Sequence, residues 1–208
     1  MVVVRTMNKT TLPTIVNVGY RSTHYWVISA DTSRLLVDIG WPGMLGTMKA
    51  NLKKMDIPLH EIRYALATHY HIDHAGLGEE LKREGVPLLV LDVQMAAIPL
   101  MKQWTKPADN YVEITAKGNV VISYAESRQL LSRIGIGGEI LHTPGHTKHC
   151  VSLLLDDGSL FTGDLPAEQY AFGDPTILAT WQMVRTRGAR RIYPAHGPIW
   201  SLDEPVAG

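Results

Sequence analysis

Several residue types are scarce in this chain, and each scarcity excludes a class of protein. The 208 residues include a single cysteine, Cys150, so an internal disulfide is impossible and a reducing, cytoplasmic location is expected. Lysine plus arginine and aspartate plus glutamate both number 20, so the formal net charge is zero and no chain-wide basic footprint for nucleic acid is present. No stretch of the sequence approaches the roughly 20 apolar residues that a membrane span needs, so no membrane partner is expected.

The composition is that of a folded protein with an unusual supply of histidine. Hydrophobic residues make up 45% of the chain and charged residues 19%, which excludes disorder as the main state. Domains hold roughly 100–200 residues, and we find no linker, repeat or low-complexity tract, so a single domain over 1–208 is predicted. Histidine occurs nine times, against two phenylalanines.

Short apolar runs separated by turn residues predict strands and helices in mixed order. Strands are expected at 16–19, 25–29, 34–39, 63–67, 87–91, 139–142, 151–155, 159–162 and 191–193. Helices are expected at 45–55, 76–85, 93–104, 130–134 and 177–187. Pro99 is expected to kink the helix at 93–104. This order indicates a layered α/β or α+β architecture.

The strongest chemical signal is an H-x-H-x-D-H run directly after the strand predicted at 63–67. Four ligand-type side chains fall within six residues: His69, His71, Asp73 and His74. Residues two apart in an extended backbone point to the same side, so His69 and His71 can face one point. The alternative is a surface histidine cluster on a solvated loop. Imidazole and carboxylate together are typical ligands of Zn, Fe(II) or Mn.

Three later positions strengthen the metal interpretation. His146 stands in the turn Thr-Pro-Gly-His-Thr after a predicted strand, Asp164 follows a glycine at another strand end, and His196 stands in Pro-Ala-His-Gly-Pro. Each position taken alone is weak, because a lone histidine beside glycine is more often structural. Together with the first motif, in this order along the chain, they are specific.

With these motifs the chain resembles the metallo-β-lactamase superfamily of metal-dependent hydrolases over roughly 16–198. The run Asp38-Ile39-Gly40 also matches the family pattern. The resemblance implies an α+β fold, an αββα sandwich in which two facing mixed sheets are covered by helices. It also implies a site at one edge of the sandwich, built from loops at strand ends.

The resemblance assigns ligands for two divalent ions, with Zn expected first and Fe or Mn as alternatives. One ion would take His69, His71 and His146, and the other Asp73, His74 and His196, with Asp164 bridging both. Asp73 would in addition orient the attacking hydroxide, and Asp38 would support a histidine ligand from behind. Two such ions can lower the pKa of a shared water toward ~7 and polarise a carbonyl or phosphoryl oxygen.

Four residues are candidates for the substrate pocket: Trp41, Tyr70, Lys148 and His149. Tyr70 lies between two ligand positions, and Trp41 follows the motif that contains Asp38. Lys148 and His149 follow His146, where relatives carry a glycine in place of His149. Cys150 begins an apolar strand and is expected in the core, not as a nucleophile. The segment 92–137 is expected to form either part of the pocket or a subunit interface, and family habit allows a homodimer.

The resemblance implies a hydrolase that uses a metal-bridging hydroxide to cleave a small ester, thioester or lactone. Glutathione thioesters are less expected, because the C-terminal helical domain of those relatives has no counterpart here. Lactonases often place a tyrosine three residues past the bridging aspartate, where this chain has Ala167. The alternatives are a mononuclear iron persulfide dioxygenase using His69, His146 and Asp164, a phosphodiesterase, and a non-catalytic metal-bound module.

Overall fold

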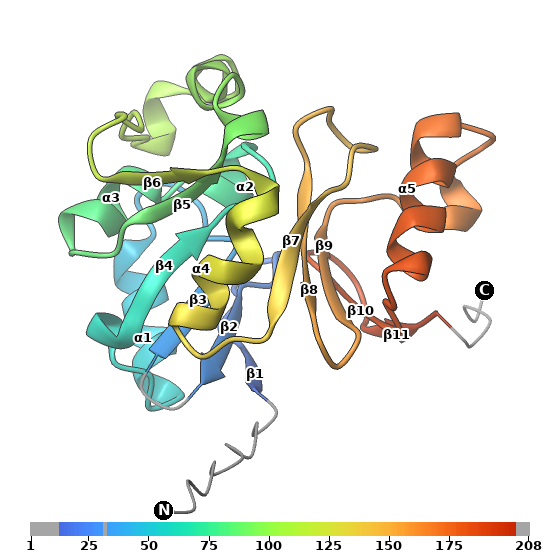
Figure 1. Ribbon diagram of the computed structural model, residues 1–208. Coiled ribbons are helices and arrows are strands. Elements are labelled where there is room, and N and C mark those ends of the chain that lie inside the picture. The colour runs from blue at the N-terminus through green and yellow to red at the C-terminus, as the bar shows by residue number, and fades with distance from the viewer. Residues whose placement is uncertain (1–12, 31–32, 203–208) are drawn as a thin grey trace, which may run out of the picture.

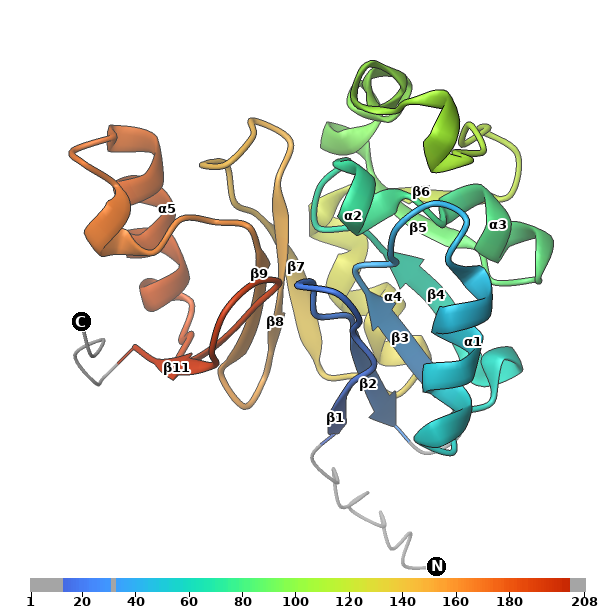
Figure 2. The same cartoon turned by 180° about the vertical axis from the view of Figure 1, so that it is seen from behind.

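The computed structural model describes residues 13–30 and 33–202, which form two β-sheets with helices around them (Figure 1). The ends of the predicted domain, 1–12 and 203–208, lie outside the described residues. Figure 2 shows the same two sheets from behind. No helix among the described residues is long and apolar enough to cross a membrane.

The first sheet has the strand order β1-β2-β3-β4-β5-β6. Its first three strands pair antiparallel and the remaining ones pair parallel. Its strands have these bounds: β1 Thr14–Asn17, β2 Trp26–Ala30, β3 Ser33–Val37, β4 Ile62–Leu66, β5 Leu88–Leu91 and β6 Asn119–Ile122. The parallel strands end at the same edge, which is where ligands bind in open α/β sheets.

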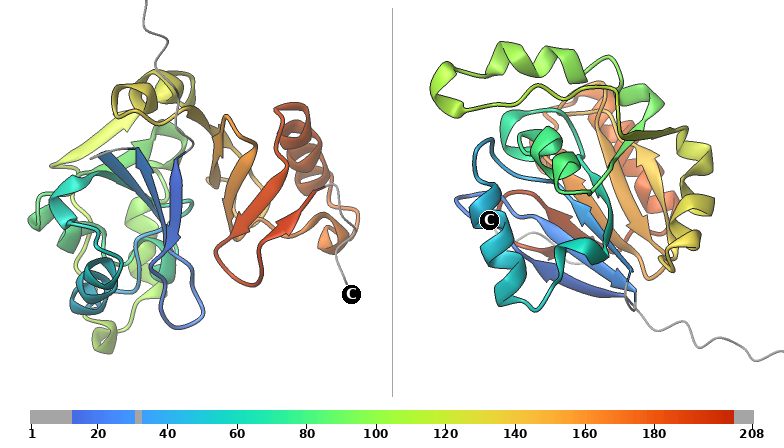
Figure 3. Two further views of the ribbon diagram at one scale, coloured as in Figure 1. Left: turned by 90° about the horizontal axis from the view of Figure 1, so that it is seen from below. Right: turned by 90° about the vertical axis from the view of Figure 1, so that its left-hand side faces the viewer.

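The second sheet has the strand order β11-β10-β9-β8-β7. Only β9 and β10 pair parallel among its described strands. Its strands have these bounds: β7 Gly138–His142, β8 Val151–Leu155, β9 Ser159–Gly163, β10 Arg191–Pro194 and β11 Trp200–Ser201. Figure 3 shows the two sheets as neighbouring layers, with the second sheet between the first sheet and its own covering helix.

Helices cover the outer face of each sheet, and one further helix packs against the layer between the sheets. Their bounds are α1 Leu45–Lys54, α2 Ile72–Ala75, α3 Gly78–Arg83, α4 Ser127–Arg133 and α5 Pro175–Thr186. Helix α4 is the one that packs between the sheets, where Leu130 and Leu131 share a core with Ile28. Short 3-10 helices stand at Leu59–Glu61, Asp92–Gln94, Ile98–Trp104, Pro107–Asp109, Tyr124–Glu126 and Glu168–Tyr170. Helix α5 begins at a strong start signal, because Asp174 accepts hydrogen bonds from the first backbone amides and Pro175 follows it.

The alternation of side chains along the strands divides the core into three layers. In β2, Val27 packs outward against α1 and α3, while Ile28 packs inward between the two sheets. On the far side of the second sheet, Ile192 packs against α5 around Trp181. Both faces of the inner strands are therefore buried, which explains why they are continuous apolar runs. The predicted αββα sandwich is confirmed.

One predicted helix is wrong. The segment 93–104 forms two short 3-10 helices, Asp92–Gln94 and Ile98–Trp104, in place of one amphipathic α-helix. Pro99 lacks the amide hydrogen that an α-helix needs at this position. The apolar residues of this segment are accordingly divided, since Met101 is buried whereas Trp104 is 61% exposed. Strands β6 and β11 were not predicted from the sequence.

Candidate metal centre

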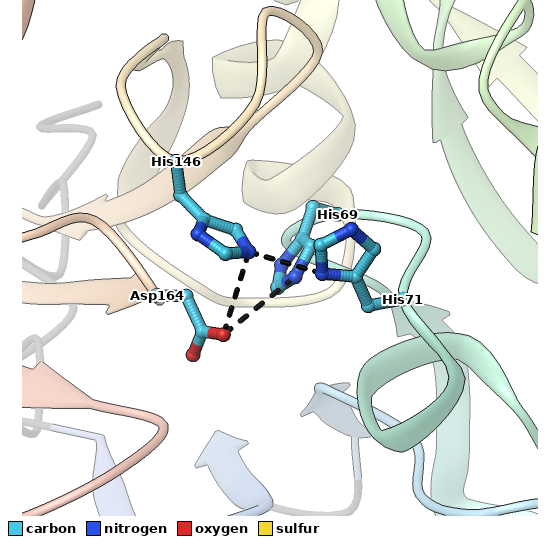
Figure 4. Close-up of side chains that lie close together, drawn as sticks. All are labelled: His69, His71, His146 and Asp164. Atoms are coloured by element: carbon cyan, nitrogen blue, oxygen red, sulfur yellow. Dashed lines mark hydrogen bonds and ion pairs between the residues drawn. The ribbon is translucent and has the colours of Figure 1, made fainter. Parts of the chain in front are cut away.

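Four side chains from three parts of the chain point toward one another and form the first group (Figure 4). They are His69 and His71 after β4, His146 between β7 and β8, and Asp164 after β9. Each offers one ligand-type atom, and these atoms all lie within 4.8 Å of one another. His146 Nε2 lies 3.0 Å from His71 Nδ1 and 3.6 Å from Asp164 Oδ2.

Three more side chains form the second group beside the first. Asp73 and His74 stand in α2, and His196 follows β10; their ligand-type atoms also lie within 4.8 Å of one another. Asp73 Oδ2 lies 3.2 Å from His196 Nε2 and 3.4 Å from His74 Nε2. The structure therefore brings together all seven residues of the predicted ligand set.

The carboxylate of Asp164 lies between the two groups. Its Oδ2 is 3.8 Å from His69 Nε2 in the first group. Its Oδ1 is 3.3 Å from His74 Nε2 and 3.4 Å from His196 Nε2 in the second. One oxygen thus faces each group, which is the orientation that a shared ligand requires.

The interior of the site contains buried polar atoms that bond to nothing in the described part of the chain. His69 Nε2, His74 Nε2 and Asp164 Oδ1 are shielded from solvent and have no hydrogen-bond partner there. Because an unsatisfied buried polar atom is costly, such atoms usually indicate an ion or a water that completes the site. Several imidazole nitrogens and a carboxylate aimed at the same space match the ligand chemistry of a divalent cation. The residues therefore fit a metal.

Asp38 holds two of the histidines from behind. It follows β3 with a positive φ of 56°, a conformation that Asp tolerates better than most residues. Its Oδ2 lies 3.0 Å from His74 Nδ1, and its Oδ1 accepts hydrogen bonds of 2.8 Å from the backbone N and Oγ1 of Thr68. Thr68 Oγ1 in turn lies 3.3 Å from His69 Nδ1. In the tautomers with hydrogen on Nδ1, both histidines keep Nε2 free to bind a metal.

A tight turn before β2, the 20–24 turn, holds the second group in the same way. The buried Thr23 donates a hydrogen bond of 3.2 Å from Oγ1 to Asp73 Oδ2. The backbone oxygen of Ser22 lies 2.6 Å from His196 Nδ1. The amide of His24 donates to the oxygen of Ala195, the residue before His196. One turn therefore orients two ligands that lie far from it in sequence.

Burial keeps the first group neutral. It lowers the pKa of His69 well below its ordinary value and also lowers the pKa of His71 and His146. Neighbouring imidazoles add to the effect for His69 and His71, since two positive charges at this distance repel. A neutral imidazole is the form that binds a metal ion, so these three side chains are ready to do so.

Nearby carboxylates determine the pKa values of the histidines in the second group. Burial opposes the charged form of His74, but the nearby Asp38 and Asp164 outweigh it and raise the pKa of His74 well above its ordinary value. The hydrogen bond with Asp73 raises the pKa of His196. Burial would raise the pKa of Asp73, yet the imidazoles of His196 and His74 beside it hold the pKa below its usual range. A metal entering this group must therefore displace protons.

The four predicted pocket residues occupy different environments. The prediction for Tyr70 is wrong, because its side chain is buried in the core between the first sheet and its helices. Trp41 is half-buried against that same core, with the guanidinium of Arg21 4.9 Å from its ring. His149 Nδ1 lies 2.7 Å from the backbone oxygen of Val93, and Lys148 is exposed. Cys150 is buried, as predicted.

Several residues at the site carried no usable sequence signal. Thr23 and Ser22 lie in a turn whose contacts appear only when the second sheet packs beside it. Trp104, at the end of the segment predicted as a helix, lies with its ring 5.7 Å from that of His71. Thr68 could have been suspected, because it directly precedes the H-x-H-x-D-H run.

The fold and the site together define a class: a two-sheet sandwich with a His/Asp cluster at one edge that can hold a divalent metal. Residues 18–196 match the family model described as metallo-beta-lactamase superfamily. The chain belongs to that superfamily, as its motifs predicted. Among solved structures it is similar to the BLEG-1 B3 metallo-beta-lactamase, with a TM-score of 0.69 and 19% identity over 92% of this chain and 94% of that one. That likeness concerns the fold alone.

The curated relatives that the chain matches are longer than the region they share with it. The chain is 27% identical over 190 residues to a beta-lactamase-like protein 2 homolog of Caenorhabditis elegans, covering 89% of this chain and 59% of that protein. It is 26% identical over 187 residues to an atrochrysone carboxyl ACP thioesterase of Aspergillus fumigatus, covering 86% of this chain and 38% of that protein. The chain thus spans about half the length of the curated relatives that it matches.

Proposed function

We propose that this protein is a hydrolase with two divalent metal ions that cleaves a carboxylic ester, thioester or lactone. The observation that carries the proposal is Asp164, which presents one oxygen to each of two adjacent ligand groups. His69, His71 and His146 would hold one ion, and Asp73, His74 and His196 the other. The thioesterase name of one relative agrees with this substrate class.

The chemistry follows from the donor set. Bound divalent ions would lower the pKa of a coordinated water toward ~7 and polarise the substrate carbonyl. Asp73 accepts hydrogen bonds at Oδ2, which fixes the carboxylate for orienting that water and taking its proton. The water oxygen bonds to the acyl carbon, and the carbon–oxygen or carbon–sulfur bond breaks with its electron pair on the leaving group. The leaving alcohol or thiol takes up a proton, and the acid is released as a carboxylate.

The charge around the site favours an acyl substrate over a phosphodiester. A cavity of about 500 Å³ opens beside His146, Asp164 and His196, and the described residues that line it include neither lysine nor arginine. A phosphodiester would bring a fixed negative charge to this cavity, where cationic side chains normally receive it. An uncharged ester or thioester needs no such partner.

Elemental analysis followed by a substrate screen tests the proposal. The protein, purified without chelators, is analysed for Zn, Fe and Mn and then assayed with lactones, thioesters, esters and phosphodiesters. We expect two ions per chain and turnover of an acyl substrate. Asp73→Asn should lower kcat by about 10²-fold or more, since general acid–base groups contribute that much. Asp56→Asn, in the exposed turn after α1, is the matched control and should retain full turnover.

Three results would reject the proposal. Binding of less than one equivalent of metal would remove its basis. Tight iron binding with sulfite production from a persulfide would point to the dioxygenase alternative, which uses His69, His146 and Asp164. Bound metal without turnover of any substrate class, together with an intact partner interaction in Asp73→Asn, would indicate a non-catalytic module.

A homodimer and a cytoplasmic location remain proposals that sedimentation and cell fractionation can test.

A further inference from the structure

The cavity beside Asp164 extends away from the ligand groups toward the outer layer of the second sheet. It lies among β9, β10, β11 and α5, on the side of the sheet that α5 covers. His146, Asp164 and His196 stand at one end of it. A cavity of about 500 Å³ is within the usual range for a small-molecule site.

Most of the inner surface of this cavity is hydrocarbon, and Thr162, Gln169 and Tyr170 add polar atoms to its lining. Leu165, Trp181 and Ile192 line it and are themselves almost fully buried. Trp181 Nε1, the polar atom of that side chain, already donates a 2.8 Å hydrogen bond to the oxygen of Pro166. Trp200 continues the surface, with its ring centre 5.5 Å from that of Trp181. Against this part of the wall a polar group would lose water and find no partner, whereas an apolar group would gain burial.

The opposite side of the site is open and differs in character. There Trp104 stands beside His71, with ring centres 5.7 Å apart and most of the indole in solvent. The two sides of the metal centre therefore offer a largely apolar cavity and an exposed aromatic surface. A substrate that is cleaved between them has one apolar part to bury and one part that leaves toward solvent.

We propose that the cavity binds the apolar acyl chain of an ester or thioester, a specificity that rests on the function proposed above. The acyl carbonyl would lie at the end formed by His146, Asp164 and His196, and the chain would extend over Trp181 toward Trp200. The alcohol or thiol would leave on the Trp104 side. Hydrolysis adds water across the acyl bond, so the products are a carboxylate and the free alcohol or thiol.

A series of acyl lengths tests this assignment. The metal-loaded protein is assayed with nitrophenyl acetate, butanoate, hexanoate and octanoate. We expect kcat/KM to rise by about fourfold for each methylene that the cavity buries. Ala167→Phe places a ring in the cavity and should lower the octanoate-to-acetate ratio of kcat/KM by about tenfold or more, equivalent to excluding two methylenes. Ala50→Phe, the same change on the exposed face of α1, should leave that ratio unaltered.

Binding without turnover provides an independent readout. Octanoate is titrated calorimetrically into the metal-free protein, where we expect heat that Ala167→Phe reduces and Ala50→Phe does not. If Ala167→Phe fails to fold by circular dichroism, Ala167→Leu makes the same test with less added volume.

The possible failures are distinguishable. A flat profile across acyl lengths, or an equal loss of acetate and octanoate turnover in the folded Ala167 variants, overturns the acyl cavity while ester hydrolysis stands. Absence of any ester or thioester turnover by the metal-loaded protein overturns the proposed function, and the acyl assignment with it.

Discussion

Replacing Thr23 by valine removes one hydroxyl group from the back of the site and leaves the shape of the side chain almost unchanged. Thr23 is 1% exposed, and its Oγ1 donates to Asp73 Oδ2 at 3.2 Å. The remaining contacts of that oxygen come from His196 and His74. The variant therefore frees Asp73 from the 20–24 turn without removing any ligand of either group.

The expected magnitude follows from the kind of bond that is lost. A hydrogen bond to a charged group contributes about 1.5–3 kcal/mol. If Asp73 binds its ion only when held in this orientation, the loss appears as weaker binding at the second group, by about 10- to 100-fold. The first group should be unaffected, because His69, His71 and His146 make no hydrogen bond to the turn among the contacts of the described residues.

Titration of the metal-free protein with Zn²⁺ or with spectroscopically visible Co²⁺ measures both sites. Wild type should show two binding events, and Thr23→Val should weaken one of them alone. Thr23→Ser keeps the hydroxyl and should restore the second event. The reasoning is refuted if Thr23→Val binds both ions as wild type does, or if it weakens both to the same extent.

Four further outcomes are expected. Asp38→Asn leaves His74 Nδ1 without its carboxylate and should weaken metal binding about 10- to 100-fold in the same titration. Lowering the pH from about 8 to about 6 should release metal from the second group before the first, because carboxylates raise the pKa of His74 and His196 and protons then compete. Equal release from both would contradict this order. Chelation should lower Tm, since an ion that binds only the folded chain stabilises it. Trp181→Ala should cost about 3–5 kcal/mol in urea unfolding, and Trp181→Phe less.

The ligand set could be predicted because each member follows a strand and stands in a short motif. The six residues from His69 to His74 come shortly after β4, and Asp164 follows Gly163 at the end of β9. Gly163 is required there, because its φ is +57° and a Cβ would lie 2.2 Å from Thr68 Oγ1. The glycine at this position is therefore a local sequence signal of the close approach between the two sheets.

The surroundings of the ligands could not be predicted, since they depend on contacts between distant segments. Tyr70 lies between the ligands His69 and His71 in the sequence. Its side chain nevertheless packs in the core, where the chain bends into α2. Thr23 is 50 residues from Asp73, and nothing in its own turn indicates the contact. At 93–104 the apolar spacing suited a helix, but Pro99 and the buried Gln94, which donates to the oxygen of Ala67, favour a different backbone path.

Each ligand group draws side chains from both halves of the sandwich. The first combines His69 and His71 after β4 with His146 and Asp164 from the second sheet, and the second joins α2 to His196 in the same way. Neither half can therefore complete a group alone. Backbone bonds already join the halves at this edge, since Val151 N donates to Thr68 O at 2.8 Å. Ions bound here would add bonds between the same two halves. Metal binding and the packing of the two sheets therefore both contribute to the folding free energy.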